Sequence, residues 1–378
     1  MSKVFYHQEM VEEWSRTGDT RGPVHMQLSL LNGCNHRCPW CSIARLQKHH
    51  QPTLIDADRL ISFLQSMVPH GLKACTLVGN GEPLMHPRAE EITRRLLNSG
   101  IEVGVFTNAS FLVGGVADAL MDATFVRMTL NAATQDMHAL THGVEGEFAR
   151  CVNNARAFSL SRSYKRPTLG VQCATHQVNL HQLPELTRLV RDYIRADYFS
   201  IKPVINRGPF HGRRPMKGIP QRERNSVDLA EAAEIFKTCE ALATPTFKVY
   251  AKSEQFGDAV PYDYNDGRDY KACIALPFEA YIHENGNFDI CGPIKLGGTS
   301  RGPGNDQGVE AFNIYRSTFE EIWRSPERQE LMRSIDLHKC PAACRPHPLN
   351  KILWDLRKNG PPAWSGEEPV ADTHVNFL

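Results

Sequence analysis

The sequence predicts an α/β fold in which a parallel sheet curls into a partial (β/α)6 barrel, followed by a C-terminal unit of a β-hairpin and helices. Three observations support this prediction: six short β-branched-rich runs between residues 24 and 204, amphipathic segments between them, and an Asn-Gly turn signal at residues 285–286. Regular alternation of strand and helix favours a parallel sheet over an antiparallel sandwich. An ordinary doubly wound α/β domain would show the same alternation.

The predicted strands are 24–31, 74–79, 102–108, 123–131, 168–175 and 198–204. Between them, "DADRLISFLQSMV" carries apolar residues at helical spacing, and "LPELTRLVRDYI" places Pro184 where a first helical turn tolerates it. Six strand and helix units are fewer than the eight of a closed barrel, so one side stays open. Reactive side chains are expected at the C-terminal ends of the strands, where such folds carry their chemistry.

The charge balance and the N-terminus exclude several classes of protein. Lys plus Arg number 43 and Asp plus Glu 42, a formal charge of +1 that gives no evidence for a nucleic-acid or membrane partner. "MSKVFYHQEMVEEW" lacks the apolar run of a signal peptide, and no window resembles a membrane span. We therefore expect a soluble, cytoplasmic protein.

The 11 cysteines indicate metal or redox chemistry, because a chain without a secretory signal is not expected to use disulfides. Seven of them form two groups: Cys34, Cys38 and Cys41, then Cys273, Cys291, Cys340 and Cys344. The remaining four lie in apolar or helical contexts and are interpreted as small buried hydrophobic residues: Cys75, Cys151, Cys173 and Cys239.

The first group has the spacing C-x3-C-x2-C and directly follows the first predicted strand. Three thiolates on one tight loop suit a 4Fe-4S cluster in which one iron has no protein ligand. An open coordination position is what a catalytic metal site needs. The alternative is a zinc site completed by His36 or His49.

This loop resembles that of the radical S-adenosylmethionine (SAM) enzymes, whose hallmark is C-x3-C-x-aromatic-C, matched by Cys34, Cys38, Trp40 and Cys41. A second motif agrees: "GNGEP" at the end of the second predicted strand is similar to the family's G-G-E-P, with Asn80 in place of a glycine. The resemblance implies a TIM-like partial barrel that binds SAM through the open iron of the cluster.

The resemblance also implies roles for individual residues. Trp40 is expected beside the adenine of SAM, and the GNGEP residues near its methionine amino group: Gly79, Asn80, Gly81, Glu82 and Pro83. Polar residues at the next strand ends are candidates for the ribose and carboxylate, although either Asn could be a turn residue: Asn108, Thr129 and Asn131. One electron from an external donor such as flavodoxin or ferredoxin then gives a 5′-deoxyadenosyl radical.

The second group surrounds a predicted hairpin, because Asn285-Gly286 favours a two-residue turn that would bring Cys273 and Cys291 together. A helix start is predicted at Ser317 with Glu320, before Cys340 and Cys344. A structural zinc site with four cysteines is one interpretation. The spacing C-x12-G-x4-C resembles SPASM and shorter twitch extensions of radical SAM enzymes. Four cysteines fit a twitch unit with one auxiliary 4Fe-4S cluster.

The expected organisation has four parts: an N-terminal extension (1–20), the radical SAM partial barrel (21–255), a twitch-type auxiliary-cluster domain (256–350), and a C-terminal helix and tail (351–378). Thirty-three residues precede the first cysteine, fewer than the leader-binding domain of about 80 residues that peptide-modifying relatives usually carry.

We therefore expect a radical SAM oxidoreductase that oxidises (dehydrogenates) or rearranges a sugar, aminocyclitol or nucleotide. Modification of a peptide or protein side chain is the alternative, and a non-catalytic iron-sulfur or zinc-binding redox protein is the alternative of another class. A basic loop after the sixth strand would hold an anionic small molecule, or be solvated surface, with Arg207, Arg213 and Arg214 as candidates. Lys202 is a candidate proton acceptor or a strand-end charge.

Overall fold

The computed structural model describes residues 3–41, 43–44, 47, 50–163, 166–204, 227–256, 268–291, 312–340, 344, 346–360 and 374–378. The strands of these residues form one sheet in the order β7-β6-β5-β4-β3-β2-β1-β8-β9. Their bounds are β1 His25–Leu28, β2 Ala74–Leu77, β3 Glu102–Thr107, β4 Phe125–Thr129, β5 Thr168–Thr175, β6 Tyr198–Pro203, β7 Lys248–Ala251, β8 Glu279–Ile282 and β9 Phe288–Asp289.

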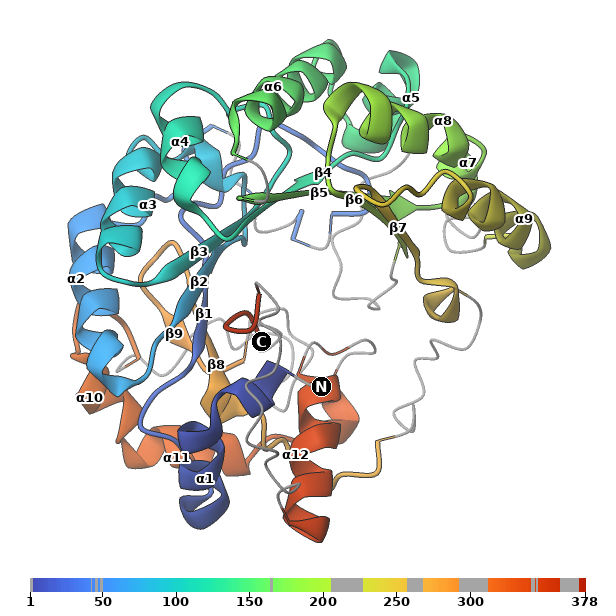
Figure 1. Cartoon of the computed structure of the whole chain (residues 1–378). Helices are drawn as coiled ribbons and strands as arrows, with labels where there is room; N and C mark the ends of the chain where they lie inside the picture. The colour runs from blue at the N-terminus through green and yellow to red at the C-terminus, as the bar shows by residue number, and fades with distance from the viewer. Residues whose placement is uncertain are drawn as a thin grey trace.

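The six predicted strands are confirmed as β1 to β6, which pair in parallel with each strand beside its neighbour in sequence. The sheet curves into an open arc with helices along its outer side (Figure 1). All the C-terminal strand ends therefore face one end of a partial barrel, as expected for this fold.

The predicted hairpin is also present, but it belongs to the main sheet. β8 pairs in parallel with β1, in the register His25 with Glu279, and β9 pairs antiparallel with β8. The turn is longer than the predicted two-residue turn: the backbone N–H of His283 donates to the Asn287 carbonyl and that of Gly286 to the His283 carbonyl, so residues 284–286 form a three-residue loop. Of these three residues Gly286 alone has the left-handed conformation, with φ +82°. The C-terminal region thus extends the sheet beside its first strand, which places residues near 284 at the same end of the barrel as the first cysteine group.

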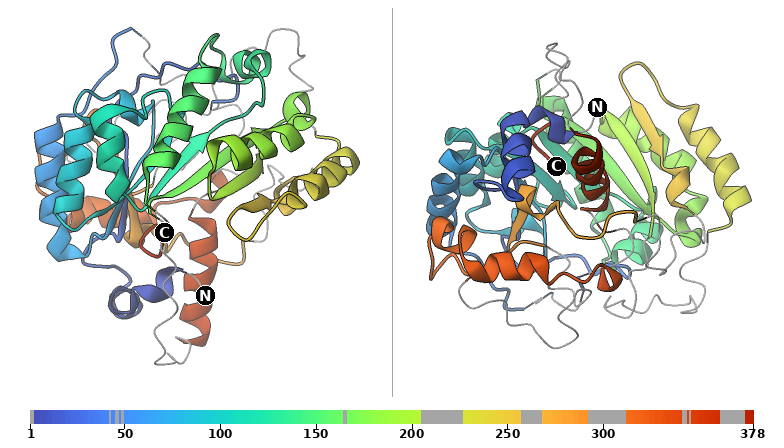
Figure 2. Two further views of the ribbon diagram at one scale, coloured as in Figure 1. Left: turned by 45° about the horizontal axis from the view of Figure 1, so that its top comes forward. Right: turned by 90° about the horizontal axis from the view of Figure 1, so that it is seen from below.

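The helices cover the outer face of the arc and the region beneath β8, as the views in Figure 2 also show. Their bounds are α1 Gln8–Thr17, α2 Ala57–Met67, α3 Ala89–Asn98, α4 Gly114–Ala119, α5 Gln135–His142, α6 Phe148–Ser161, α7 Gln177–Leu180, α8 Leu183–Arg188, α9 Leu229–Glu240, α10 Phe319–Trp323, α11 Pro326–Arg333 and α12 His347–Asn359. The segment predicted as one helix after Pro184 divides into α8 and a π-helical turn, Leu189–Ile194.

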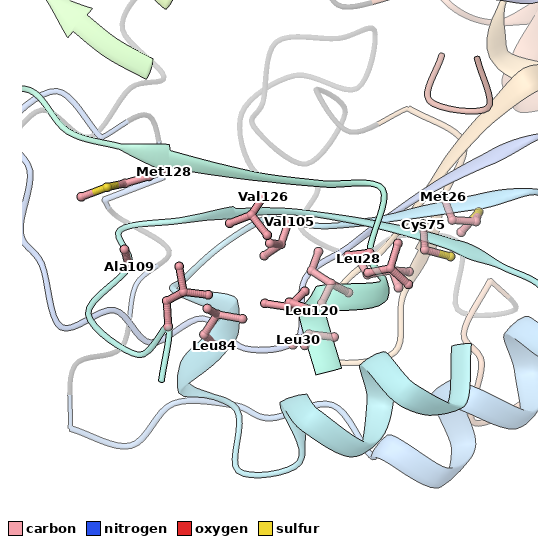
Figure 3. Packing of buried hydrophobic residues seen from close by; sticks show 14 of the residues in the cluster. Met26, Leu28, Leu30, Cys75, Leu84, Val105, Ala109, Leu120, Val126 and Met128 are labelled. Carbon is pink, nitrogen blue, oxygen red and sulfur yellow. The ribbon is translucent and has the colours of Figure 1, made fainter. Parts of the chain in front are cut away.

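The main core lies between the sheet and its outer helices (Figure 3). In α2, Leu60, Ile61 and Leu64 are at most 1% exposed, because the helix turns its apolar stripe toward the strands. Each such side chain contributes about 1.5–3 kcal/mol by leaving water. Asp56 caps this helix by accepting a hydrogen bond from the Arg59 amide.

A second core joins the two ends of the chain. Residues of α1 pack with Leu353 and Leu356 of α12 and with Phe278, which precedes β8. Helix α10 begins one residue later than predicted, because Thr318 and Glu321 form the capping box in place of Ser317 and Glu320. No helix in the described part of the chain has the length and apolar character needed to cross a bilayer.

Candidate functional site

The first cysteine group lies on a loop, residues 33–41, that follows β1 at the C-terminal end of the sheet; we call it the cysteine loop. The backbone N–H of Glu82 donates to the carbonyl of Gly33 over 2.8 Å. A Cβ on Gly81 would lie 2.0 Å from the same carbonyl oxygen, so only glycine fits there. The GNGEP residues therefore hold the start of the cysteine loop by direct backbone contact.

The Glu82 carboxylate joins the ends of β2 and β3. It accepts from the Thr107 hydroxyl (2.6 Å) and from the backbone N–H groups of Asn108 (2.7 Å) and Leu84 (3.2 Å). Burial raises the pKa of Glu82 to about 7, against the opposing effect of these donors. Three of about four acceptor positions on the carboxylate are used. The predicted contact of Glu82 with SAM stays a prediction, and Pro83 begins a short buried turn beside it.

The next two strand ends also reach the cysteine loop. The side-chain amide of Asn108, after β3, donates to Asn35 Oδ1 over 2.8 Å. After β4, the backbone N–H of Asn131 donates to His142 Nε2 (3.0 Å), and the backbone carbonyl of His142 accepts from Arg37 N (2.9 Å). Asn131 Oδ1 accepts from Ala174 N on β5. The residues after β2 and β3 thus contact the loop directly, and those after β4 contact it through His142.

Two further predicted SAM contacts lie at this end of the barrel. The ring of Trp40 stacks on His176, which follows β5, with centroids 6.0 Å apart and an interplanar angle of 20°. Thr129 is the half-buried last residue of β4. Their roles toward SAM stay predictions.

Asn80, the departure from the G-G-E-P pattern, contacts the C-terminal hairpin. Its amide donates to Glu284 Oε2 (2.8 Å) and lies 3.4 Å from His283 Nδ1. Ser29 donates its hydroxyl to the same Glu284 oxygen (2.9 Å) and accepts from the Asn80 backbone N–H. His283 in turn contacts Asp289 of β9 over 2.6 Å. The substituted asparagine therefore links the GNGEP loop to the hairpin that leads to Cys291.

The residues of the cysteine loop fit an iron-sulfur cluster better than a single ion. The three thiols are half-buried on one loop. Among described residues, ligand atoms within 4.8 Å of one another occur in two sets: His36 with Cys38 and His142, and His36 with His138 and Cys151. The three loop thiols do not form such a set, which suits thiolates that each bind a different iron. The zinc alternative through His36 is therefore disfavoured, and His49 lies outside the described residues.

Three residues of the second cysteine group, Cys273, Cys340 and Cys344, lie near Tyr270. Burial raises the pKa of the Tyr270 phenol, and nearby Cys344, Cys273 and Cys340 raise it further. Burial also raises the pKa of the Cys340 thiol to about 11, with the neighbouring Cys273 adding to the shift. A metal or cluster would remove these thiol protons. Three of the four predicted ligands thus neighbour one tyrosine, and Cys273 also neighbours Cys340.

Asn350 of α12 holds the Cys273 segment of this group. Its Nδ2 donates to Cys273 Sγ over 3.3 Å, and its Oδ1 accepts from the backbone N–H groups of Ile274 (2.7 Å) and Ala275 (2.9 Å). Cys291, which follows β9, is 8% exposed, and its membership of the ligand set stays a prediction.

The remaining candidates concern substrate. Lys202 is half-buried near the end of β6, and its role as a base stays a prediction. Arg207, Arg213 and Arg214 lie outside the described residues.

Sequence reasoning missed several polar residues around the cysteine loop, among them His142 and His176. One signal was present for the first: His138 and His142 are four residues apart in a helical segment, so their side chains share a face. Nothing local in the sequence pointed to the contact between Trp40 and His176.

Comparison with known proteins identifies the barrel. Residues 28–168 match the family model of the radical SAM superfamily. A tungsten-containing aldehyde ferredoxin oxidoreductase cofactor-modifying protein of Pyrococcus furiosus is 25% identical, over 43% of this chain and 47% of its own length. A GTP 3′,8-cyclase of Chlorobaculum tepidum is 25% identical, over 57% of this chain and 63% of its length. The matches therefore span about half the length of these curated relatives.

Two further comparisons extend the likeness. AlbA of Bacillus subtilis, an antilisterial bacteriocin subtilosin biosynthesis protein, is 22% identical over 49% of this chain and 40% of its length. The structure of Streptococcus suis SuiB bound to SAM covers 89% of this chain and 76% of its own, with a TM-score of 0.59 and 13% identity. At that identity the likeness shows the fold, and a second SuiB structure holds a precursor peptide.

These matches confirm the predicted fold and family resemblance. Residues 28–168 are thus similar to the radical SAM domain, a kind of domain that binds a 4Fe-4S cluster and SAM.

Proposed function

We propose that this radical SAM domain makes the chain an enzyme that cleaves SAM and abstracts hydrogen from a small organic substrate. The observation that carries the proposal is the cysteine loop itself. Its residues are held from the ends of β2, β3 and β4 by Glu82, Asn108 and Asn131, directly or through His142. Such convergence supports a loop that presents three thiolates to three irons of a cluster and leaves the fourth iron without a protein ligand.

In this proposal Cys34, Cys38 and Cys41 hold three irons of a 4Fe-4S cluster. Bound there, the cluster and SAM supply a 5′-deoxyadenosyl radical and so the power to remove an unactivated hydrogen. The chain's own residues bind and orient: Trp40, stacked on His176, offers an apolar surface for the adenine. Gly81 keeps the GNGEP backbone against the loop.

An auxiliary cluster is proposed for the second group, with Cys273, Cys291, Cys340 and Cys344 as ligands. Four thiolates leave no open position, so this cluster suits electron transfer or structural support over SAM binding. Support comes from the convergence of three of these thiols around Tyr270 and from the hydrogen bond of Asn350 to Cys273.

For the substrate we propose oxidation or rearrangement of a nucleotide, sugar or aminocyclitol, with an external flavodoxin or ferredoxin as electron donor. The similarity to GTP 3′,8-cyclase supports a nucleotide-like molecule. Peptide modification is the second candidate, and the similarity to AlbA favours it.

Anaerobic reconstitution tests the proposal. We expect about eight iron atoms per chain and release of 5′-deoxyadenosine from SAM under dithionite. About four iron atoms without SAM cleavage would instead indicate a non-catalytic redox protein. To separate the substrate classes, nucleotides, phosphorylated sugars, aminocyclitols and peptides are added in turn. The true substrate should raise 5′-deoxyadenosine formation at least about tenfold. The mass of the product then shows whether the substrate has lost two hydrogens, as in an oxidation, or retained them, as in a rearrangement.

A further inference from the structure

Three buried histidines lie behind the cysteine loop. His36 is part of the loop, and His138 and His142 project from one face of α5. The rings of His138 and His142 stack with centroids 4.1 Å apart and an angle of 9°, and the His36 ring meets both edge-on. None of the three is more than 2% exposed. Neither ring nitrogen of His138 has a hydrogen-bond partner among the described residues, so the pattern of hydrogen bonds runs through His36 and His142.

One backbone amide determines that pattern. The Asn131 N–H can only donate, so His142 Nε2 accepts it and the neutral ring carries its proton on Nδ1. His142 Nδ1 lies 3.1 Å from His36 Nδ1, which must therefore accept and carry its own proton on Nε2. That N–H faces Ser110 Oγ at 3.3 Å, and the Ser110 hydroxyl lies 3.2 Å from Cys151 Sγ.

The donor order leaves no lone pair at His36 Nδ1 for a metal ion, because the His142 N–H occupies it. The set of His36, Cys38 and His142, although compact, is thus better explained as a hydrogen-bonded chain than as an ion site. Both rings are neutral in this arrangement, which avoids a charge in a buried position.

The same chain reaches a cysteine of the loop. His142 Nδ1 lies 3.9 Å from Cys38 Sγ, so its N–H is shared between His36 and the sulfur. The backbone of α5 adds a second contact, from Arg37 N to the His142 carbonyl. Gly143, with φ +64°, ends the helix there, and a Cβ on it would lie 2.2 Å from the Arg37 carbonyl oxygen. Helix α5 therefore contacts both the side chain of Cys38 and the backbone beside it.

We propose that His142 and His36 are positioning residues that hold the Cys38 thiolate against a neutral N–H donor and so set the reduction potential of the cluster on the cysteine loop. This inference rests on the proposed function. A hydrogen bond to a cluster sulfur stabilises negative charge on it, and more so in the reduced state. Removal of the donor should therefore make the potential more negative.

The redox test compares three full-chain variants. His142→Phe keeps a ring that can stack on His138 but removes every hydrogen bond of the imidazole. His142→Asn retains a short amide that can place an N–H near the position of Nδ1. His25→Phe is the matched control, because His25 is also buried and hydrogen-bonded (Nε2 to Thr76 Oγ1, 2.8 Å) but begins β1 at the opposite end of the sheet.

The measured quantity is the midpoint potential of the cluster whose electron paramagnetic resonance signal changes when SAM is added. We expect a more negative potential in His142→Phe, a value closer to the native one in His142→Asn, and no shift in His25→Phe. If His142→Phe takes up no iron on the cysteine loop, the result supports the role of His142 in positioning the Cys38 thiolate. The effect on the reduction potential is then measured in His142→Asn. A native potential in His142→Phe would overturn the redox role.

The tautomers are tested separately by 15N NMR of the full chain, prepared without clusters and labelled only on histidine. The resonances lost in His142→Phe identify His142. We expect an unprotonated Nε2 and a protonated Nδ1 at neutral pH. Protonation on Nε2, or on both nitrogens, would overturn the donor order. Native protein with no SAM-responsive cluster would overturn the proposed function and the redox role with it, while this spectrum would still test the hydrogen-bonded chain.

Discussion

The two cysteine groups of this chain are held in opposite ways. Cys34, Cys38 and Cys41 come from one short loop, whose backbone and polar side chains are fixed by the ends of neighbouring strands. Cys273 and Cys340 come from segments far apart in sequence and both lie near Tyr270, and a helix holds the Cys273 segment through Asn350. The first arrangement is local and leaves the thiols half-buried; the second depends on long-range packing. Loss of the cluster from one cysteine group should therefore leave the other group able to bind its own cluster.

The largest expected effect separates the two groups outright. Replacing Cys34, Cys38 and Cys41 together with Ala should reduce SAM cleavage below detection, because three iron ligands are lost at once. Iron should fall from about eight to about four atoms per chain, since the second group is untouched. Cys75→Ala, at a buried cysteine of β2, is the control and should retain both SAM cleavage and the full iron content. Loss of all iron in the triple variant would contradict independence.

The converse variant is Asn350→Leu. Leucine has the same branched shape but leaves two backbone N–H groups without an acceptor, at a cost of about 1–3 kcal/mol each, and removes the donor to Cys273. We expect iron to fall toward about four atoms per chain, while SAM cleavage without substrate stays within about tenfold of native. Asn359→Leu on the same helix is the control, because Asn359 is exposed and bonds only Asp355. Unchanged iron in Asn350→Leu would show that α12 does not organise the second group.

The free energy of unfolding should depend on pH through Glu82, whose backbone contacts the loop of the first group. Burial raises the pKa of Glu82 from 4.5 to about 7, so between these pH values the unfolded chain loses this proton while the folded chain retains it. The contribution of Glu82 to the free energy of unfolding should then decrease by about 3 kcal/mol as pH rises through this window, and be constant on either side.

Glu82→Gln cannot ionise and should lack that decrease. Urea unfolding of the cluster-free protein between about pH 4 and pH 8 measures it. Glu12→Gln, at an exposed position, controls for the loss of a carboxylate. Equal pH slopes for native protein and Glu82→Gln would exclude a raised pKa at this position.

The smallest expected effect concerns the contact between the GNGEP residues and the C-terminal hairpin. Asn80→Gly restores the G-G-E-P pattern but removes the amide that donates to Glu284. We expect a loss of about 1–2 kcal/mol of stability, with SAM cleavage changed by less than about tenfold. Asn80→Asp, which places a carboxylate against Glu284, should be more destabilising. A glycine variant as stable as the native protein would show that the hairpin is held without Asn80.

Local sequence signals were sufficient for β1 to β6 and for the hairpin, whereas β7 was not predicted and the ligand role of the first cysteine group stays a prediction. The six runs became β1 to β6 because β-branched, apolar segments between amphipathic helices have few other ways to bury their side chains. The helix α10 start was displaced by one residue, since both Ser317 and Thr318 offer a capping hydroxyl and a Glu three residues later. The hairpin was predicted from its turn, but its place in the main sheet was not, because a turn signal does not specify which strand the hairpin pairs with.

The sequence by itself determined the strands β1 to β6 of the partial barrel, the spacing of the first three cysteines and the GNGEP motif after the second strand. Only the tertiary structure decided the partners of those residues. His36 and His142 are 106 positions apart, and Asn80 and Glu284 are 204 positions apart, yet each pair is in hydrogen-bond contact. The physical reason is that strand and turn preferences act over a few residues, whereas a buried polar group must find its partner wherever the packed chain places one.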